Sequence, residues 1–541
     1  MNPLVQLMIA AVCGAWTHLA VFRRGEWERR APWVAFTYLA LEALWLFVLS
    51  PHLQVHSYWA ISVTYFAALF SSMVVYRAFF HPLHNVPGPF KARITAFWSM
   101  WDPAFFRTVQ RLHQQYGDFV RIRPREMSIN HIDAVRAIHG CRTTCSKGPW
   151  YDFLGHSLQA TRDKDLHSER RRVWDMGLNS DALKHYEPYI WIHCVDLIKQ
   201  LSMNIDRPIP ITEWVRFFSF DVMGEMVLGK SFQMVQNGKP HVAVAQEAAM
   251  HRFMGPMVHV TWLLIILQKL PFLAYFRQRW VDWCASQLEE REKRSRTRVD
   301  LFSYLLDSGA GEPKLYTQSR QDLTADADLA FVAGSDTTAG TLCALIYLLA
   351  KYPEKQRKLQ KEVGQIVSSI SDISHRNLQV RAPYLNSCIH EALRLFPNVP
   401  SGVQRLTPAE GMSIAGRWIP GNTLVSTPTY TLHRDERYFK DPGDFVPERW
   451  SSHPELVLHK EAFNPFLIGA YSCAGKSVAQ MEMRMLMAAL VFSFSFDFPE
   501  EEKARMSTIL EGPELKETFV LNLPEIQMVF TAREERDSLN G

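Results

Sequence analysis

The chain is poor in cysteine and nearly balanced in charge, and both features exclude classes of protein. Its 541 residues include eight cysteines, none in a CxxC pair, so we expect neither a disulfide scaffold nor a zinc knuckle. Lysine and arginine number 59 and aspartate and glutamate 55, a formal net charge of +4. This balance excludes a disordered polyampholyte, and it predicts no nucleic-acid partner bound through bulk charge.

Apolar residues, in contrast, are abundant and are concentrated in three blocks at the start of the chain. Residues 3–22 and 57–76 contain no Asp, Glu, Lys or Arg, and residues 31–50 contain only Glu42. Each block is about twenty residues long, enough for a helix to cross a hydrocarbon core. We therefore predict a membrane anchor over residues 1–80 with about three transmembrane helices. The block with Glu42 is alternatively a buried or interfacial helix, because a carboxyl at membrane depth is costly.

The loops between these blocks predict the orientation of the anchor. The loop 23–30 holds four arginines, whereas the loop around 51–56 holds no lysine or arginine. Basic loops stay in the cytoplasm, so we expect the first loop in the cytoplasm and the second in the lumen. With three spans, the N-terminus is then lumenal and everything after residue 76 is cytoplasmic.

A proline-rich segment and a long helical body follow the anchor. The three prolines of residues 81–89 predict a stiff, extended hinge. Residues 90–541 show no repeat and no linker, so we expect one domain, mainly α-helical with small β-sheets. The apolar stretch 257–276 is interrupted by a lysine and a proline, so it is either core or a surface that dips into the membrane. The periodicity predicts helices at 104–116, 325–352, 353–370 and 477–494 and strands at 119–122 and 423–426.

The segment FLIGAYSCAG at 466–475 carries the most specific chemistry in the sequence. Cys473 lies between two glycines and just before a predicted helix, whose N-terminal N–H groups and dipole favour a thiolate. The glycines also let the backbone pass close to a flat ligand. These residues alone are compatible with a metal-ligating cysteine or with a buried structural one.

This segment resembles the haem-binding loop of the cytochrome P450 family, whose pattern is Phe-x-x-Gly-x-Arg-x-Cys-x-Gly. Phe466, Gly469, Cys473 and Gly475 match it, and Tyr471 replaces the usual arginine. The resemblance implies the P450 fold and a haem b cofactor whose iron is bound by the Cys473 thiolate. It also implies that Phe466, Gly469 and Tyr471 lie against the cofactor.

A second motif, AGSDTT at 333–338, lies inside the predicted central helix. A glycine in mid-helix costs about 1 kcal/mol relative to alanine. The side chains that follow it can bond the backbone and open the helix. By the resemblance, the opening holds dioxygen, Thr337 hydrogen-bonds that dioxygen and Asp336 relays protons to it. An ordinary kinked core helix is the alternative interpretation.

Two further groups match the family. Glu391 and Arg394 lie three residues apart on one helix face and can pair. By the resemblance, Arg449 of the sequence PERW completes a Glu–Arg–Arg network, to which we assign the structural role of holding the cysteine loop.

The second group is a set of cations for the two haem carboxylates. His167 and Arg171 lie four residues apart on one helix face. Together with Arg405 they match the family's contacts to the haem propionates, which arginine forks bind well. Because Tyr471 removes one expected cation, we expect haem binding to depend more on these three residues. Arg170, by contrast, is expected on a solvated face.

The resemblance implies a haem-thiolate monooxygenase that uses O2 to oxidise a hydrophobic small molecule. Electrons are expected from a membrane-bound NADPH–cytochrome P450 reductase, with cytochrome b5 as a further candidate donor. Lys460, Lys476 and Arg170 are candidate contacts for that partner. The alternatives are an O2-independent haem-thiolate isomerase or dehydratase, against which the Asp336–Thr337 pair argues, and a non-enzymatic haem protein.

The anchor and the cysteine-loop variant resemble fungal members that act in secondary metabolism. This resemblance implies a terpenoid, polyketide or indole alkaloid substrate, which enters from the lipid bilayer. It also implies a protein of the endoplasmic reticulum membrane with its catalytic domain in the cytoplasm. Phe331 is expected to face the pocket, as are segments that match the family's variable loops: 150–158, 253–267, 398–403 and 518–519.

Overall fold

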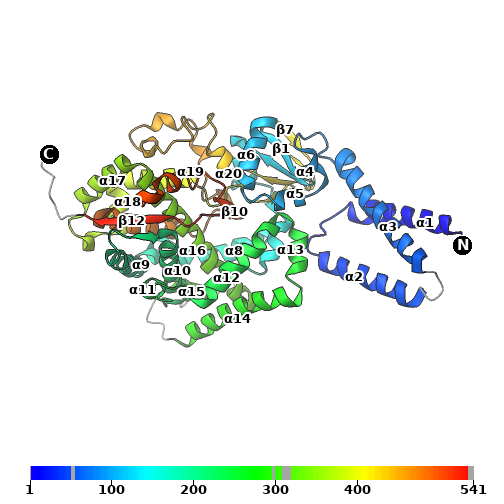
Figure 1. Ribbon diagram of the computed structural model, residues 1–541, viewed down its shortest axis with the longest axis horizontal. Helices are drawn as coiled ribbons and strands as arrows, with labels where there is room; N and C mark the ends of the chain where they lie inside the picture. The colour runs from blue at the N-terminus through cyan, green and yellow to red at the C-terminus, as the bar shows by residue number, and fades with distance from the viewer. Residues whose placement is uncertain (1, 50–54, 295–298, 307–317, 534–541) are drawn as a thin grey trace.

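The computed structural model describes residues 2–49, 55–294, 299–306 and 318–533. Figure 1 shows a helical arm, which contains the N-terminus, attached to a larger and mainly helical body with small sheets. This combination is the predicted fold class. The predicted lumenal loop at 51–56 lies largely outside the described residues.

The arm consists of three helices, each extended at its C-terminal end by a π-helical turn: α1 (Pro3–Thr17), α2 (Ala31–Leu44) and α3 (Val55–Val75). Two stretches, Pro3–Phe22 and Tyr58–Phe80, are long and apolar enough to cross a membrane, whereas Ala31–Phe47 is shorter. The helix α16 (Arg320–Lys351) also meets these criteria, but 61% of its apolar window is buried inside the body. The number of spans therefore stays a prediction.

The helices of the arm contact one another through small and polar residues. A Cβ atom at Gly14 of α1 would lie 2.3 Å from the carbonyl oxygen of Tyr65, so α1 and α3 pack closely only because this residue is glycine. The Glu42 carboxylate of α2 accepts hydrogen bonds from Tyr58 and, at 3.1 Å, from Ser62 of α3. The charge within the second apolar block is therefore satisfied by its neighbour.

The body is organised around α16. A capping box formed by Ser319 and Asp322 begins this helix, which packs against α10 (Ile211–Leu228). The predicted helices appear within a few residues of their expected bounds, as α6 (Phe105–Tyr116), α16, α17 (Pro353–Ile366) and α21 (Lys476–Ser493). The other long helices are α8 (Lys164–Gly177), α9 (Ser180–Ser202), α12 (Val242–Met254), α14 (Pro271–Lys293) and α19 (Pro383–Leu395).

A five-stranded sheet lies on one side of the body, with the order β1-β2-β8-β5-β3. Its strands are β1 (Phe119–Arg123), β2 (Glu126–Ile129), β3 (Ser146–Lys147), β5 (Arg405–Leu406) and β8 (Leu424–Ser426). β2 and β8 are parallel and the other pairs are antiparallel. The pairing of β3 with β5 places Lys147 opposite Arg405.

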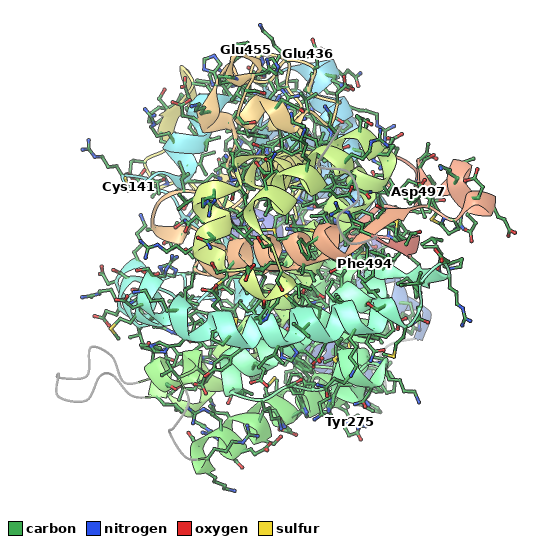
Figure 2. All side chains as sticks on the ribbon, turned by 90° about the vertical axis from the view of Figure 1, so that its left-hand side faces the viewer. Cys141, Tyr275, Glu436, Glu455, Phe494 and Asp497 are labelled. Carbon is green, nitrogen blue, oxygen red and sulfur yellow. The ribbon has the colours of Figure 1, made fainter. Side chains whose placement is uncertain are left out.

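A second sheet follows the helix that comes after the cysteine loop. β9 (Phe494–Asp497) continues directly from α21, as the labels at its two ends show in Figure 2. It pairs with β12 (Gln527–Ala532), which also pairs with β4 (Pro208–Pro210).

The proline-rich segment 81–89 is packed against the body. Leu83 and Val86 are buried in one apolar cluster with Met127 and Ile129 of β2. The backbone N–H of Arg121 donates to the carbonyl oxygen of Pro87 at 2.8 Å. The segment forms turns on the sheet, so the arm joins the body through a packed connection.

Candidate active site

A cavity of about 720 Å³ lies inside the body, and Cys473 contributes to its wall. Its size is within the range of pockets that hold small ligands. α8, α16, the loop before α21 and the hairpin of β10 (Lys516–Thr518) and β11 (Val520–Asn522) form parts of the wall. The aromatic residues of the lining include Trp150, Tyr151, Phe153, Trp174, Trp280, Trp283 and Phe519.

The loop that carries Cys473 has little conformational freedom. The Cys473 N–H donates to the carbonyl oxygen of Phe466 at 2.9 Å. Gly469 has φ +74°, and a Cβ atom there would lie 2.2 Å from the carbonyl oxygen of His139, so the close approach requires glycine. Burial raises the pKa of the Cys473 thiol, while the N–H groups of Gly475 and Lys476 and the charge of Arg171 oppose that rise.

Four basic side chains line the cavity near this loop. They are Lys147 of β3, His167 and Arg171 of α8, and Arg405 of β5. Burial and the neighbouring cations lower the pKa of His167 to about 3 and that of Lys147 to about 6. Burial is the larger cause of both shifts and the neighbouring cations add to it, so a bound anion would favour the charged forms of these side chains.

The ring of Tyr471 lies at the centre of this cationic cluster. Its centroid is 4.8 Å from the Lys147 ammonium, 5.0 Å from the Arg405 guanidinium and 4.7 Å from the His167 ring. Arg171 reaches the cysteine loop by donating to the carbonyl oxygen of Ser472. The structure therefore brings together the predicted cations and Tyr471.

Unpaired polar atoms test whether the cluster fits a haem. Among the described residues, no carboxylate lies within ion-pair distance of Lys147, His167 or Arg405, and Arg171 pairs only with Asp175, at 2.7 Å. Arg405 Nε and the Tyr471 hydroxyl are also buried, and neither has a hydrogen-bond partner among the described residues. Buried donors of this kind match the two carboxylates of a haem, so the residues fit the cofactor.

Lys147 is the residue of this cluster that the sequence did not reveal. It donates to the carbonyl oxygens of Leu158 and Gln159, at 3.2 and 2.8 Å, and lies opposite Arg405 in the sheet. No local motif surrounds it, so only the strand pairing identifies it as part of the site.

Arg170 corrects two expectations. The sequence predicted a solvated residue and a candidate contact for a redox partner, but only 2% of its side chain is exposed. It forms an ion pair with Asp326 of α16 at 2.8 Å, and Asp326 also accepts from the Leu158 N–H at 2.7 Å. Arg170 is therefore an internal link between α8 and α16. Lys460 and Lys476 are exposed, as expected for contacts with a partner.

The AGSDTT motif faces the cavity without interrupting its helix. All of α16 is described, and it is continuous from Arg320 to Lys351. The predicted opening of its backbone hydrogen bonds is therefore not observed. The Thr337 hydroxyl instead donates to the carbonyl oxygen of Ala333 at 2.8 Å. Asp336 Oδ1 lies 3.7 Å from Arg216 Nε of α10, and both Thr337 and Asp336 line the cavity.

The residues Glu391, Arg394 and Arg449 meet in a fully buried network. Glu391 accepts from Arg394 at 2.8 and 2.9 Å and from Arg449 at 2.9 Å. Trp450 donates to the same carboxylate at 2.8 Å. The remaining guanidinium N–H groups bind backbone carbonyls, including those of His433, Lys440, Asp441, Pro442 and Asp444.

Most of the predicted substrate segments reach the cavity, but Phe331 does not. Residues of 150–158, 253–267, 398–403 and 518–519 line it. Phe331 is fully buried in an apolar cluster, with its ring 5.6 Å from that of Trp283 and 5.7 Å from that of Phe232. Its position before the motif turns it away from the cavity, toward α14.

Comparisons with known proteins agree with this site. The family model described as Cytochrome P450 matches residues 87–529. The chain is 37% identical to "Cytochrome P450 monooxygenase nodW" of Hypoxylon pulicicidum, over 97% of this chain and 98% of that protein. It is 36% identical to "Cytochrome P450 monooxygenase FCK2" of Fusarium pseudograminearum, over 96% and 97%. It is 33% identical to "Tryprostatin B 6-hydroxylase" of Neosartorya fischeri, over 97% and 98%.

These matches cover nearly the whole chain, including the cysteine loop, the central helix and the cationic cluster. Such coverage confirms the predicted enzyme class, a monooxygenase, and its cofactor, a haem whose iron is bound by a cysteine thiolate. It also confirms the likeness to fungal enzymes of secondary metabolism. The chain belongs to the cytochrome P450 family.

Proposed function

We propose that the protein is a membrane-anchored haem-thiolate monooxygenase that inserts one oxygen atom of O2 into a hydrophobic secondary metabolite. The observation that carries this proposal is the position of Cys473 in one cavity with four basic side chains and several aromatic ones. When bound through a thiolate, a haem supplies the activation of O2 and the transfer of oxygen. The chain supplies the ligand, the proton path and the substrate pocket.

Cys473 is the proposed iron ligand. The N–H groups of Gly475 and Lys476, at the N-terminus of α21, and the charge of Arg171 stabilise its thiolate. Phe466 and Gly469 hold the loop in position, and His167, Arg171, Arg405 and Lys147 bind the two propionates, assisted by the Tyr471 hydroxyl. The Glu391–Arg394–Arg449 network holds the backbone that precedes the loop.

Thr337 and Asp336 are the proposed proton-delivery residues. Both line the cavity, and Asp336 lies beside Arg216, which gives its carboxylate a charged neighbour from α10. The Thr337 hydroxyl holds a proton at Oγ1, within reach of the cavity. Thr337→Ala is expected to uncouple O2 consumption from product formation, and unchanged coupling would contradict this role.

The electron donor that we propose is a membrane-bound NADPH–cytochrome P450 reductase, with cytochrome b5 as an additional donor. The exposed Lys460 and Lys476 are the candidate contacts.

The apolar helices of the arm support attachment to the endoplasmic reticulum membrane with the body in the cytoplasm and, with three spans, a lumenal N-terminus. Leu270, Phe272 and Tyr275 are exposed on and before α14 and support a lipid-facing surface; Tyr275 lies at the lower edge of Figure 2.

The substrate class that we propose is a terpenoid, polyketide or indole alkaloid. Aromatic and aliphatic side chains line much of the wall, and the Trp150 and Phe519 rings stack with centroids 4.4 Å apart. Such a wall favours a large apolar molecule over a small polar one. One of the similar proteins carries a name that refers to hydroxylation of tryprostatin B.

Two experiments test this function. The reduced, CO-bound difference spectrum of the purified protein should show the thiolate band, and Cys473→Ser should remove it. Membranes that contain the protein and a reductase should then convert a candidate metabolite, in the presence of NADPH, to a product heavier by one oxygen atom. A wild-type protein that binds haem without the thiolate band would contradict the proposal.

A further inference from the structure

The loop between the first two helices of the arm lies against the body. Glu26 accepts two hydrogen bonds from the Arg162 guanidinium, at 2.8 and 2.9 Å, in a bidentate ion pair. Nearby, Glu28 lies 3.3 Å from Arg125, which also donates to the carbonyl oxygen of Gly25 at 3.4 Å. Two acidic residues of a loop that otherwise carries four arginines therefore pair with arginines of the body.

Arg162 connects this loop to the cavity wall. Its guanidinium also binds the Asp152 carboxylate at 3.0 Å and the carbonyl oxygen of Lys147 at 3.0 Å. Asp152 belongs to η5 (Pro149–Leu154), whose residues Trp150, Tyr151, Phe153 and Leu154 line the cavity. One arginine thus joins the arm, the aromatic wall and the strand that carries Lys147.

A second contact also connects the arm to the cavity wall. α13 (Thr261–Leu267) packs against α2 on one side and against η5 on another, and Figure 1 shows it between the arm and the body. Gln268, directly after α13, donates to the carbonyl oxygen of Phe153 at 3.5 Å. The wall segment 147–162 is therefore supported by the arm both directly and through α13.

We propose that the loop 23–30 is a docking element for the segment 147–162, and that Glu26 is a positioning residue for the substrate side of the cavity. The inference rests on the proposed function, because it assigns a role to the wall of the same site. The side chains of Glu26 and Arg162 are 30% and 25% exposed, so the pair lies at the rim of the contact between arm and body, where it holds the wall segment in position. The anchor then contributes to ligand binding as well as to membrane attachment.

The test compares Glu26→Gln with the wild-type protein, both full-length, haem-loaded and in lipid nanodiscs. 4-Phenylimidazole, whose imidazole nitrogen binds the haem iron and whose phenyl ring reaches the wall, is titrated by absorbance. We expect its Kd to rise roughly three- to tenfold, because the substitution removes a charge-assisted ion pair that holds the wall in position. The Kd of imidazole itself, which does not reach the wall, should stay the same. Hydrogen exchange of residues 147–162 should become faster.

Controls separate this inference from the proposed function. Arg24→Gln removes a charge from an exposed residue of the same loop and should leave both Kd values unchanged. Arg162→Lys retains the charge but cannot form the bidentate pair, so it should raise the Kd of 4-phenylimidazole by a smaller factor. A normal CO difference spectrum in every variant shows that the haem site is intact. With that spectrum normal, unchanged phenylimidazole binding and unchanged exchange in Glu26→Gln would overturn the docking role. An abnormal wild-type spectrum would instead contradict the proposed function.

Discussion

Two buried clusters of basic residues in this protein differ in how their charges are satisfied. In the first, the Glu391 carboxylate binds Arg394, Arg449 and Trp450, and backbone carbonyls accept the other guanidinium N–H groups. In the second, Lys147 and Arg405 face the cavity beside Tyr471 without a carboxylate partner among the described residues. We therefore propose a structural role for the first cluster, whose charges the chain itself satisfies, and a ligand-binding role for the second, which lacks an anion.

The largest loss of folding stability is expected from Glu391→Gln, in the cluster whose charges the chain itself satisfies. Removal of the carboxylate leaves two buried guanidinium groups without their counter-charge, a loss of about 3–5 kcal/mol of folding stability. The expected result is protein that retains little haem and unfolds at a lower temperature, measured by absorbance and thermal denaturation. Glu448→Gln is the matched control because its partners, Lys355 and Lys358, lie nearer to solvent. An equal loss in both variants would contradict the distinction.

The same carboxyl predicts a pH dependence. Burial raises the pKa of Glu391, but Arg394 and Arg449 outweigh it, so the pKa lies below its ordinary value of 4.5. A carboxyl with a lowered pKa contributes stability that is fully present above the unfolded value and is lost as the pH falls through the folded one. Acid denaturation followed below pH 4.5 should therefore be steeper in the wild-type protein than in Glu391→Gln.

Arg405→Gln should weaken haem binding while the fold is retained. In the apoprotein the substitution removes the hydrogen bonds that the Arg405 guanidinium donates to the Tyr151 hydroxyl at 2.6 Å and to the Gln404 carbonyl oxygen at 2.9 Å. In the haem complex it also removes a buried partner of a propionate, for which the unpaired Nε is available. We expect a loss of roughly 2 kcal/mol, about thirtyfold in haem affinity, measured by transfer of haem to apomyoglobin. Arg437→Gln, at a surface pair with Asp118, should leave haem transfer unchanged. Unchanged transfer in Arg405→Gln would contradict the propionate assignment.

Lys147 predicts that haem binding takes up a proton. Burial, then Arg405 and other cations, lower the pKa of Lys147 to about 6, so the apoprotein holds it neutral at pH 8. A bound carboxylate favours the ammonium form, so binding at pH 8 should take up about one proton. Calorimetry in buffers of different ionisation enthalpy measures this uptake, and Lys147→Met should abolish it. For the same reason, the stability of the apoprotein should rise with pH between about 6 and 10.5.

The smallest effect is expected from Tyr471→Arg, which restores the residue usual in the family. A further cation beside Lys147 and Arg405 destabilises the apoprotein and strengthens propionate binding, by about 1 kcal/mol each. Slower haem loss together with a lower unfolding temperature of the apoprotein is the expected result. Tyr471→Phe removes only the hydroxyl and should speed haem loss slightly. Faster haem loss in Tyr471→Arg would show that the tyrosine is better suited to this cluster.

Much of the fold could be predicted because its signals are local. Helix periodicity located α6, α16 and α21 within a few residues, and the capping box at Ser319 shows why α16 begins there. The cysteine loop was recognisable because glycines and a helix N-terminus surround Cys473 within ten residues. Phe331 was misplaced because a position close to the motif in the sequence does not mean a position on the same face of the helix, and Phe331 packs against Trp283 and Phe232.

The cysteine loop and the pairing of Glu391 with Arg394 could be predicted because each depends on residues close together in the chain. The enzyme class followed from the resemblance of these motifs to the cytochrome P450 family. Three other features depend on the folded chain: Lys147 lies opposite Arg405 and beside Tyr471, Arg170 is internal, and Glu26 pairs with Arg162. The physical reason is that burial and charge pairing depend on which distant segments meet. A lysine opposite an arginine across β3 and β5 has no local pattern, although the pair helps to form the anion site of this enzyme.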